Sequence, residues 1–262
     1  MYAIGRNKLI RSIVKELTYL PENSRLLHIT GEEGIGKKFV CKYAARYAFD
    51  RKVFSSGVLH IELRNKFALK QEICGRIASA LELFFADQES IASHIKHSKL
   101  LIILNKDVSI EWDVQSLNDT LDFFLRETYV PKFLVIADQE DLVSLPAKRS
   151  IPVEELGRKA SAQLLMLFAE NKIDIELRGI DNLLKDHDIF ELIPRSPASI
   201  IRFAQYLKTC KGEYLNAVVR RHLRGEDTAI RHEEGLKKRG EPMELTLERD
   251  WEIRKSYDFL RT

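Results

Sequence analysis

The chain has 262 residues, of which 45% are hydrophobic, so it can bury the core of one large α/β domain and a smaller part beside it. Its 42 basic and 39 acidic residues leave a net charge of only +3, far from the balance of a dedicated nucleic-acid binder. No apolar run approaches the roughly 20 residues that span a bilayer, and the first residues lack the apolar core of a signal peptide. We therefore expect no membrane partner and a cytoplasmic location.

Alternating apolar and amphipathic segments predict the fold of the first part of the chain. Arg6 opens the first amphipathic stretch, at 6–17. Short apolar runs typical of buried strands follow at 25–30, 58–63, 99–104 and 132–137, with a weaker fifth at 150–154, and helical spacing recurs at 37–48, 67–85 and 117–125. Strands that alternate with helices predict a parallel sheet covered on both faces. We assign this α/β domain to residues 1–156.

Helical patterns replace the strand signals beyond residue 156, at 159–170, 179–187, 196–209 and 214–223. They predict a small helical subdomain over 157–224. The remaining segment, 225–262, is dense in mixed charge and is expected to be solvated and partly ordered. Cys41, Cys74 and Cys210 are odd in number and widely spaced, which favours reduced thiols over disulfides or a metal site.

A glycine-rich segment directly follows the first predicted strand. Residues 31–37 match G-x-x-x-x-G-K at every fixed position and open a helical stretch. Glycines let the backbone bend closely around a phosphate, while the converging N–H groups and the helix N-terminus attract the anion. A P-loop with a nucleotide-binding function is predicted, although a simple strand-to-helix turn would use similar residues. The predicted phosphate-binding residues are Gly31, Gly34, Ile35, Gly36, Lys37 and Lys38.

The residues that usually hold magnesium differ from the full motif. Lys38 stands where a Ser or Thr hydroxyl normally binds Mg²⁺, and a cationic side chain cannot coordinate a cation. Lys38 either faces solvent or offsets phosphate charge itself, so Mg²⁺ is a doubtful cofactor. Asn105 occupies the expected place of the acid that ends the third strand, and Asp107 is the candidate catalytic carboxylate only if that strand continues further. An unpaired Asp138, after the fourth strand, would repel a triphosphate.

At this point the sequence resembles the signal-transduction (STAND) NTPases with an NB-ARC-type domain, a branch of P-loop ATPases related to AAA+ proteins. The resemblance rests on five segments: Ile4-Gly5-Arg6, HITGEEGIGKK, LLIILNKDV, residues 132–138 and IPRSPASI at 193–200. It implies that ATP or ADP is bound, with Ile4 and Arg6 flanking the adenine and ribose and Pro197 packing against the base. The sequence departs from the family at the Walker B and sensor positions and lacks a clear winged-helix domain; His187 is interpreted as a surface helix residue.

Four functions remain open. The first is an adenine-nucleotide-binding regulatory protein, a pseudo-ATPase switch with weak or no hydrolysis that acts on a protein partner. The second is an active ATPase whose metal ligand is Asp107 or the Glu32 and Glu33 pair. The third is a nucleotide-free scaffold that binds another protein through its helical part and residues 251–260. DNA binding through arginines 220, 221, 224 and 231 is weakened by the acids among them, so nucleic acid is not the expected partner.

Overall fold

A five-stranded parallel sheet forms the centre of the computed structural model, which describes residues 3–19, 25–64, 68–106, 113–138, 145, 148–169 and 195–209. The strand order is β2-β3-β4-β1-β5, so β1 lies between the two strands that come last in the chain. The predicted α/β class is confirmed. The strands are β1 (Leu26–Thr30), β2 (Gly57–Leu63), β3 (Leu100–Lys106), β4 (Lys132–Ile136) and β5 (Lys148–Pro152).

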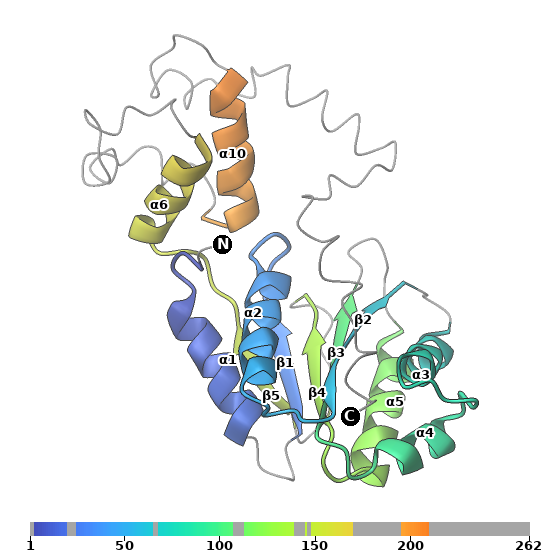
Figure 1. Ribbon diagram of the computed structural model, residues 1–262. Helices are drawn as coiled ribbons and strands as arrows, with labels where there is room; N and C mark the ends of the chain where they lie inside the picture. Colours follow the sequence, from blue (N-terminus) through green and yellow to red (C-terminus); the bar gives the residue numbers. More distant parts are fainter. Residues whose placement is uncertain are drawn as a thin grey trace. The chain divides into compact units, whose positions relative to one another are not determined.

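Helices cover both faces of this sheet (Figure 1). Alternate residues of β3 show the two sides: Leu101 and Ile103 pack with α1 and α2, while Ile102 and Leu104 pack with the other three helices. All four side chains are buried, as expected for a central strand of a parallel sheet. The helices are α1 (Asn7–Tyr19) and α2 (Lys37–Asp50) on one face, and α3 (Leu69–Ala80), α4 (Gln88–Ile95) and α5 (Val114–Glu127) on the other.

The helix predicted over 67–85 is shorter than expected and is followed by a second one. Glu82 adopts a left-handed conformation with φ 53°, which ends α3. The backbone N–H of Leu83 donates to the carbonyl of Ala78 (2.9 Å), and that of Glu82 donates to Ser79 (3.3 Å), the two bonds of a Schellman motif. Helix α4 was not predicted, although Asp87 is a recognisable N-cap whose carboxylate accepts from the N–H of Ser90 at 2.8 Å.

A second compact unit contains two of the predicted later helices. Contacts divide the chain into a sheet unit over Arg6–Glu154 and a helical unit that includes residues 3–5 and the described residues after Glu154. In the helical unit, α6 (Arg158–Ala169) packs against α10 (Pro197–Thr209). The helices predicted at 179–187 and 214–223, with His187, Cys210 and the charged segment, lie outside the described residues. Among the helices that the structure describes, none is long and apolar enough to cross a membrane.

The apolar contact between α6 and α10 is a cluster of eight buried side chains. They belong to both helices and to the residues just before α6, and they explain why these amphipathic segments fold against each other rather than separately. The cluster consists of Leu156, Ala162, Leu165, Ala169, Ile200, Phe203, Ala204 and Leu207.

Candidate functional site

Parallel strands bring the candidate residues to one edge of the sheet. The glycine-rich loop follows β1, and Glu62 and Asn105 are register partners near the carboxyl ends of β2 and β3. Asn105 is in turn the register partner of Ile136, the last residue of β4, two residues before Asp138. This carboxyl edge is where open α/β sheets bind ligands.

The loop between β1 and α2 has a backbone that its glycines make possible. Gly36, the N-cap of α2, is left-handed with φ 94°. Gly31 has φ 147°, and a Cβ there would lie 2.8 Å from the backbone oxygen of Val153. A side chain at either position would strain the loop. Because α2 begins at Lys37, the loop ends at a helix N-terminus, whose free N–H groups favour an anion.

Lys37 has all three hydrogens of its ammonium group directed to oxygen atoms. Its Nζ donates to the carbonyls of Gly31 (2.6 Å) and Glu32 (2.9 Å) and to Oδ1 of Asp138 (2.6 Å). Only 10% of the Lys37 side chain is exposed. The carboxylate that was expected to be unpaired is therefore the counter-ion of the P-loop lysine. An ammonium has three donors, so a phosphate that bound Lys37 would have to replace one of these partners.

Arg6 holds the backbone of the same loop through hydrogen bonds from its side chain. Its guanidinium donates to the backbone carbonyls of Ile35 (2.9 Å) and Glu154 (2.7 Å), and the residue is only 6% exposed. Burial lowers the pKa of the Arg6 guanidinium. These two bonds join the start of the sheet unit, the phosphate loop and the segment after β5. The contact of Arg6 with adenine and ribose stays a prediction.

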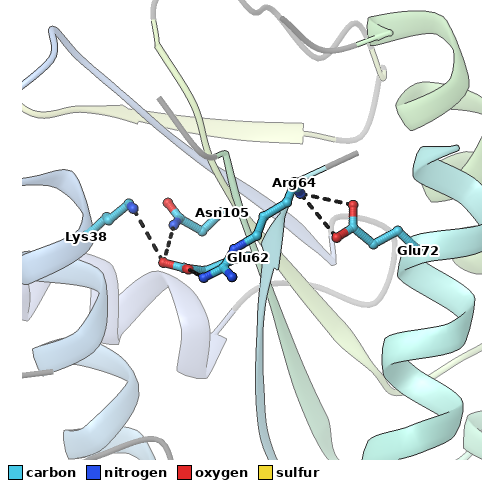
Figure 2. A network of polar contacts seen from close by, with 5 residues as sticks. All are labelled: Lys38, Glu62, Arg64, Glu72 and Asn105. Atoms are coloured by element: carbon cyan, nitrogen blue, oxygen red, sulfur yellow. Dashed lines mark hydrogen bonds and ion pairs between the residues drawn. The ribbon is translucent and has the colours of Figure 1, made fainter. Parts of the chain in front are cut away.

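Lys38 belongs to a charged network at the ends of β2 and β3 (Figure 2). Its Nζ lies 3.5 Å from Oε1 of Glu62, and the same oxygen accepts from Nδ2 of Asn105, also at 3.5 Å. The other oxygen of Glu62 accepts from the guanidinium of Arg64 at 2.9 Å. Glu72 fixes the backbone of Arg64, whose N–H donates to both of its carboxylate oxygens (3.1 and 3.0 Å).

The charge state of Glu62 follows from these neighbours. Burial alone would raise the pKa of its carboxyl. The hydrogen bond from Arg64 and the electrostatic effects of Lys38, Arg64 and His60 outweigh burial, so the pKa of the Glu62 carboxyl lies below its ordinary value. Glu62 is therefore an anion at neutral pH, shared between two cations.

The described residues do not fit a conventional magnesium site. The position after Lys37 offers an ammonium in place of a hydroxyl oxygen, and Asn105 offers an amide that is only 1% exposed. Glu62 is the nearby carboxylate, but Lys38 and Arg64 already balance its charge. Glu32 and Glu33 are exposed on the loop, and Asp107 lies outside the described residues, directly after the end of β3.

The structure also locates the two remaining predicted residues. Ile4 and Pro197 both belong to the helical unit. Pro197 is the first residue of α10, where its fixed φ suits a helix start, and the hydroxyl of Ser196 before it accepts from the N–H of Ser199 at 3.2 Å. Packing of Pro197 against a base stays a prediction, as does the adenine contact of Ile4.

Sequence reasoning missed Glu62 and the pairing of Asp138 with Lys37. Glu62 had a visible signal, because it is an acid between the buried Ile61 and Leu63 at the end of a predicted strand. The pairing of Asp138 had none, since 101 residues separate it from Lys37 and only the sheet order places β4 beside β1.

Comparisons with known proteins concern the fold. Protein-family models give no match, and curated protein sequences give none either. Among solved structures, the chain is similar to the one titled "Structure of C. elegans PCH-2", with a TM-score of 0.50 and 15% sequence identity. The match covers 84% of this chain and 66% of that chain, slightly less than two thirds of its length. The likeness concerns the fold alone, an α/β arrangement with a parallel sheet covered by helices.

Proposed function

We propose that this protein is a regulatory nucleotide-binding module of the P-loop kind, which binds ADP or ATP with little need for magnesium and with weak or no hydrolysis. The observation that carries the proposal is the loop itself: positive-φ glycines after β1, a helix that begins at Lys37, and the ammonium of Lys37 held over the loop carbonyls. This arrangement has the parts that bind phosphate in P-loop proteins. The preference for adenine rests on the NB-ARC resemblance.

Low magnesium dependence is supported by the network around Lys38. In the conventional site, a hydroxyl and a carboxylate hold a metal ion beside the phosphates. Here the corresponding positions carry the Lys38 ammonium and the Asn105 amide, gathered around Glu62. A fixed cation next to the loop offers part of the charge compensation that a metal ion supplies. It offers no activated water or bridging ligand, which is why hydrolysis is proposed to be weak.

A switch between two states of the protein needs only the free energy of nucleotide binding. A ligand present at 100 times its dissociation constant stabilises the bound state by about 2.7 kcal/mol without any chemical step. We propose that this energy alters how the protein meets a protein partner, as the resemblance to signal-transduction NTPases implies.

Thermal unfolding with and without nucleotide tests the proposal. ADP at saturating concentration is expected to raise the melting temperature of the protein by several degrees, and the Lys37→Ala variant should lose the shift because its loop no longer carries the ammonium. Lys70→Ala is the matched control, since Lys70 is an exposed lysine on α3, across the sheet from α2. A shift that survives in Lys37→Ala, or no shift for the unmodified protein, would reject nucleotide binding at this loop.

A further inference from the structure

The contact between Lys37 and Asp138 places a negative charge at the phosphate site. Asp138 lies two residues beyond the end of β4, and its Oδ1 is 2.6 Å from Nζ of Lys37. The carboxylate is 36% exposed, so it faces the region open to solvent rather than the core. No other partner of Asp138 is seen among the described residues.

The carboxylate is the strongest of the three partners that Lys37 has. Its bond joins two opposite charges, whereas the bonds to Gly31 and Glu32 end on neutral carbonyls. An incoming phosphate therefore displaces a carbonyl more easily than it displaces Asp138. A phosphate oxygen that shared the ammonium with Asp138 would lie within roughly 5.5 Å of the carboxylate, given ordinary charged hydrogen-bond lengths.

We propose that Asp138 is a specificity-determining residue that makes the site favour a nucleoside diphosphate over a triphosphate. This inference rests on the proposed function. The P-loop lysine reaches the β- and γ-phosphates, so a third phosphate enters the region next to the carboxylate. In conventional sites a divalent cation neutralises that phosphate, but Lys38 is a single positive charge that is shared with Glu62 and offers only part of that compensation. The additional negative charge of a triphosphate thus meets Asp138 with no further cation beside it to balance that charge.

Equilibrium titrations of ADP and ATP in EDTA test this inference. The unmodified protein is expected to bind ADP at least about tenfold more tightly than ATP, because one uncompensated like-charge contact at this separation near a surface costs no less than that. Asp138→Asn keeps the shape of the side chain and removes its charge. In this variant the ATP affinity should rise more than the ADP affinity, and the ratio of the two should fall towards one.

Asp50→Asn is the matched control, because Asp50 is a half-exposed aspartate paired with Arg46 at the opposite end of α2 from the loop. It should keep the tenfold ratio. ATP binding as tight as ADP binding in the unmodified protein, or a ratio that Asp138→Asn leaves unchanged, would overturn the role of Asp138 and leave nucleotide binding standing. Absence of binding by either nucleotide would overturn both this inference and the proposed function.

Discussion

Arg6 shows how a single buried side chain can determine the shape of the candidate site. It provides donors to two carbonyl oxygens that belong to segments 29 and 148 residues away in the sequence. Removing those donors leaves the carbonyls of Ile35 and Glu154 without these partners in a mostly buried region. A buried polar group without a partner costs about 1–3 kcal/mol. The geometry of the phosphate loop therefore depends on a residue that need not touch phosphate.

We expect Arg6→Ala to lower the free energy of unfolding by about 1–3 kcal/mol and to weaken nucleotide binding in parallel. Chemical denaturation and nucleotide titration measure the two effects. Arg149→Ala is the control, since Arg149 is 52% exposed and pairs with Glu16, a surface contact whose loss costs about 0–1 kcal/mol. Equal and small effects of the two substitutions would contradict the supporting role of Arg6.

At the scale of elements, the end of α3 carries a testable strain. Glu82 has φ 53° within the Schellman motif, a conformation that costs a non-glycine residue roughly 1 kcal/mol and glycine much less. Glu82→Gly should therefore raise the free energy of unfolding by up to about 1 kcal/mol, less the entropy that glycine adds to the unfolded chain. Urea denaturation provides the measurement.

Arg76→Gly is the control in the same helix, and it is expected to change the free energy of unfolding in the opposite direction. Arg76 is exposed in the interior of α3, where glycine should lower the free energy of unfolding by about 1 kcal/mol. If Glu82→Gly destabilised the protein as much as Arg76→Gly does, the left-handed cap would be the wrong description of this helix end.

Elements with strong local patterns were the predictable part of the fold. Apolar runs located all five strands to within two residues at each end, because buried parallel strands need nearly continuous apolar sequence. The break between α3 and α4 was missed, since helical spacing continues past Ala80 and only the backbone of Glu82 interrupts it. In the site, the glycine–lysine loop was visible as a motif. The partners of Lys37 and Lys38 depend on strand order and register, which no local pattern encodes.

At the scale of the whole molecule, the phosphate loop is connected to the points where the chain enters and leaves the sheet unit. That unit begins at Arg6 and ends at Glu154, and the guanidinium of Arg6 joins Glu154 to Ile35 of the loop. A ligand that fixes the loop therefore also stabilises both ends of the unit. In the proposed function, nucleotide binding would reach both ends of the sheet unit through these bonds, without hydrolysis.

The most direct test of the central claim is the affinity for ADP, measured by isothermal titration calorimetry once with excess Mg²⁺ and once with EDTA. The Lys38 network predicts affinities that agree within about threefold, less than 1 kcal/mol of binding free energy. Lys38→Thr, which restores a hydroxyl and removes the fixed cation, should weaken binding in EDTA. Tight binding of the unmodified protein only when Mg²⁺ is present would contradict the account, since it would mean that a metal ion and not Lys38 balances the phosphate charge.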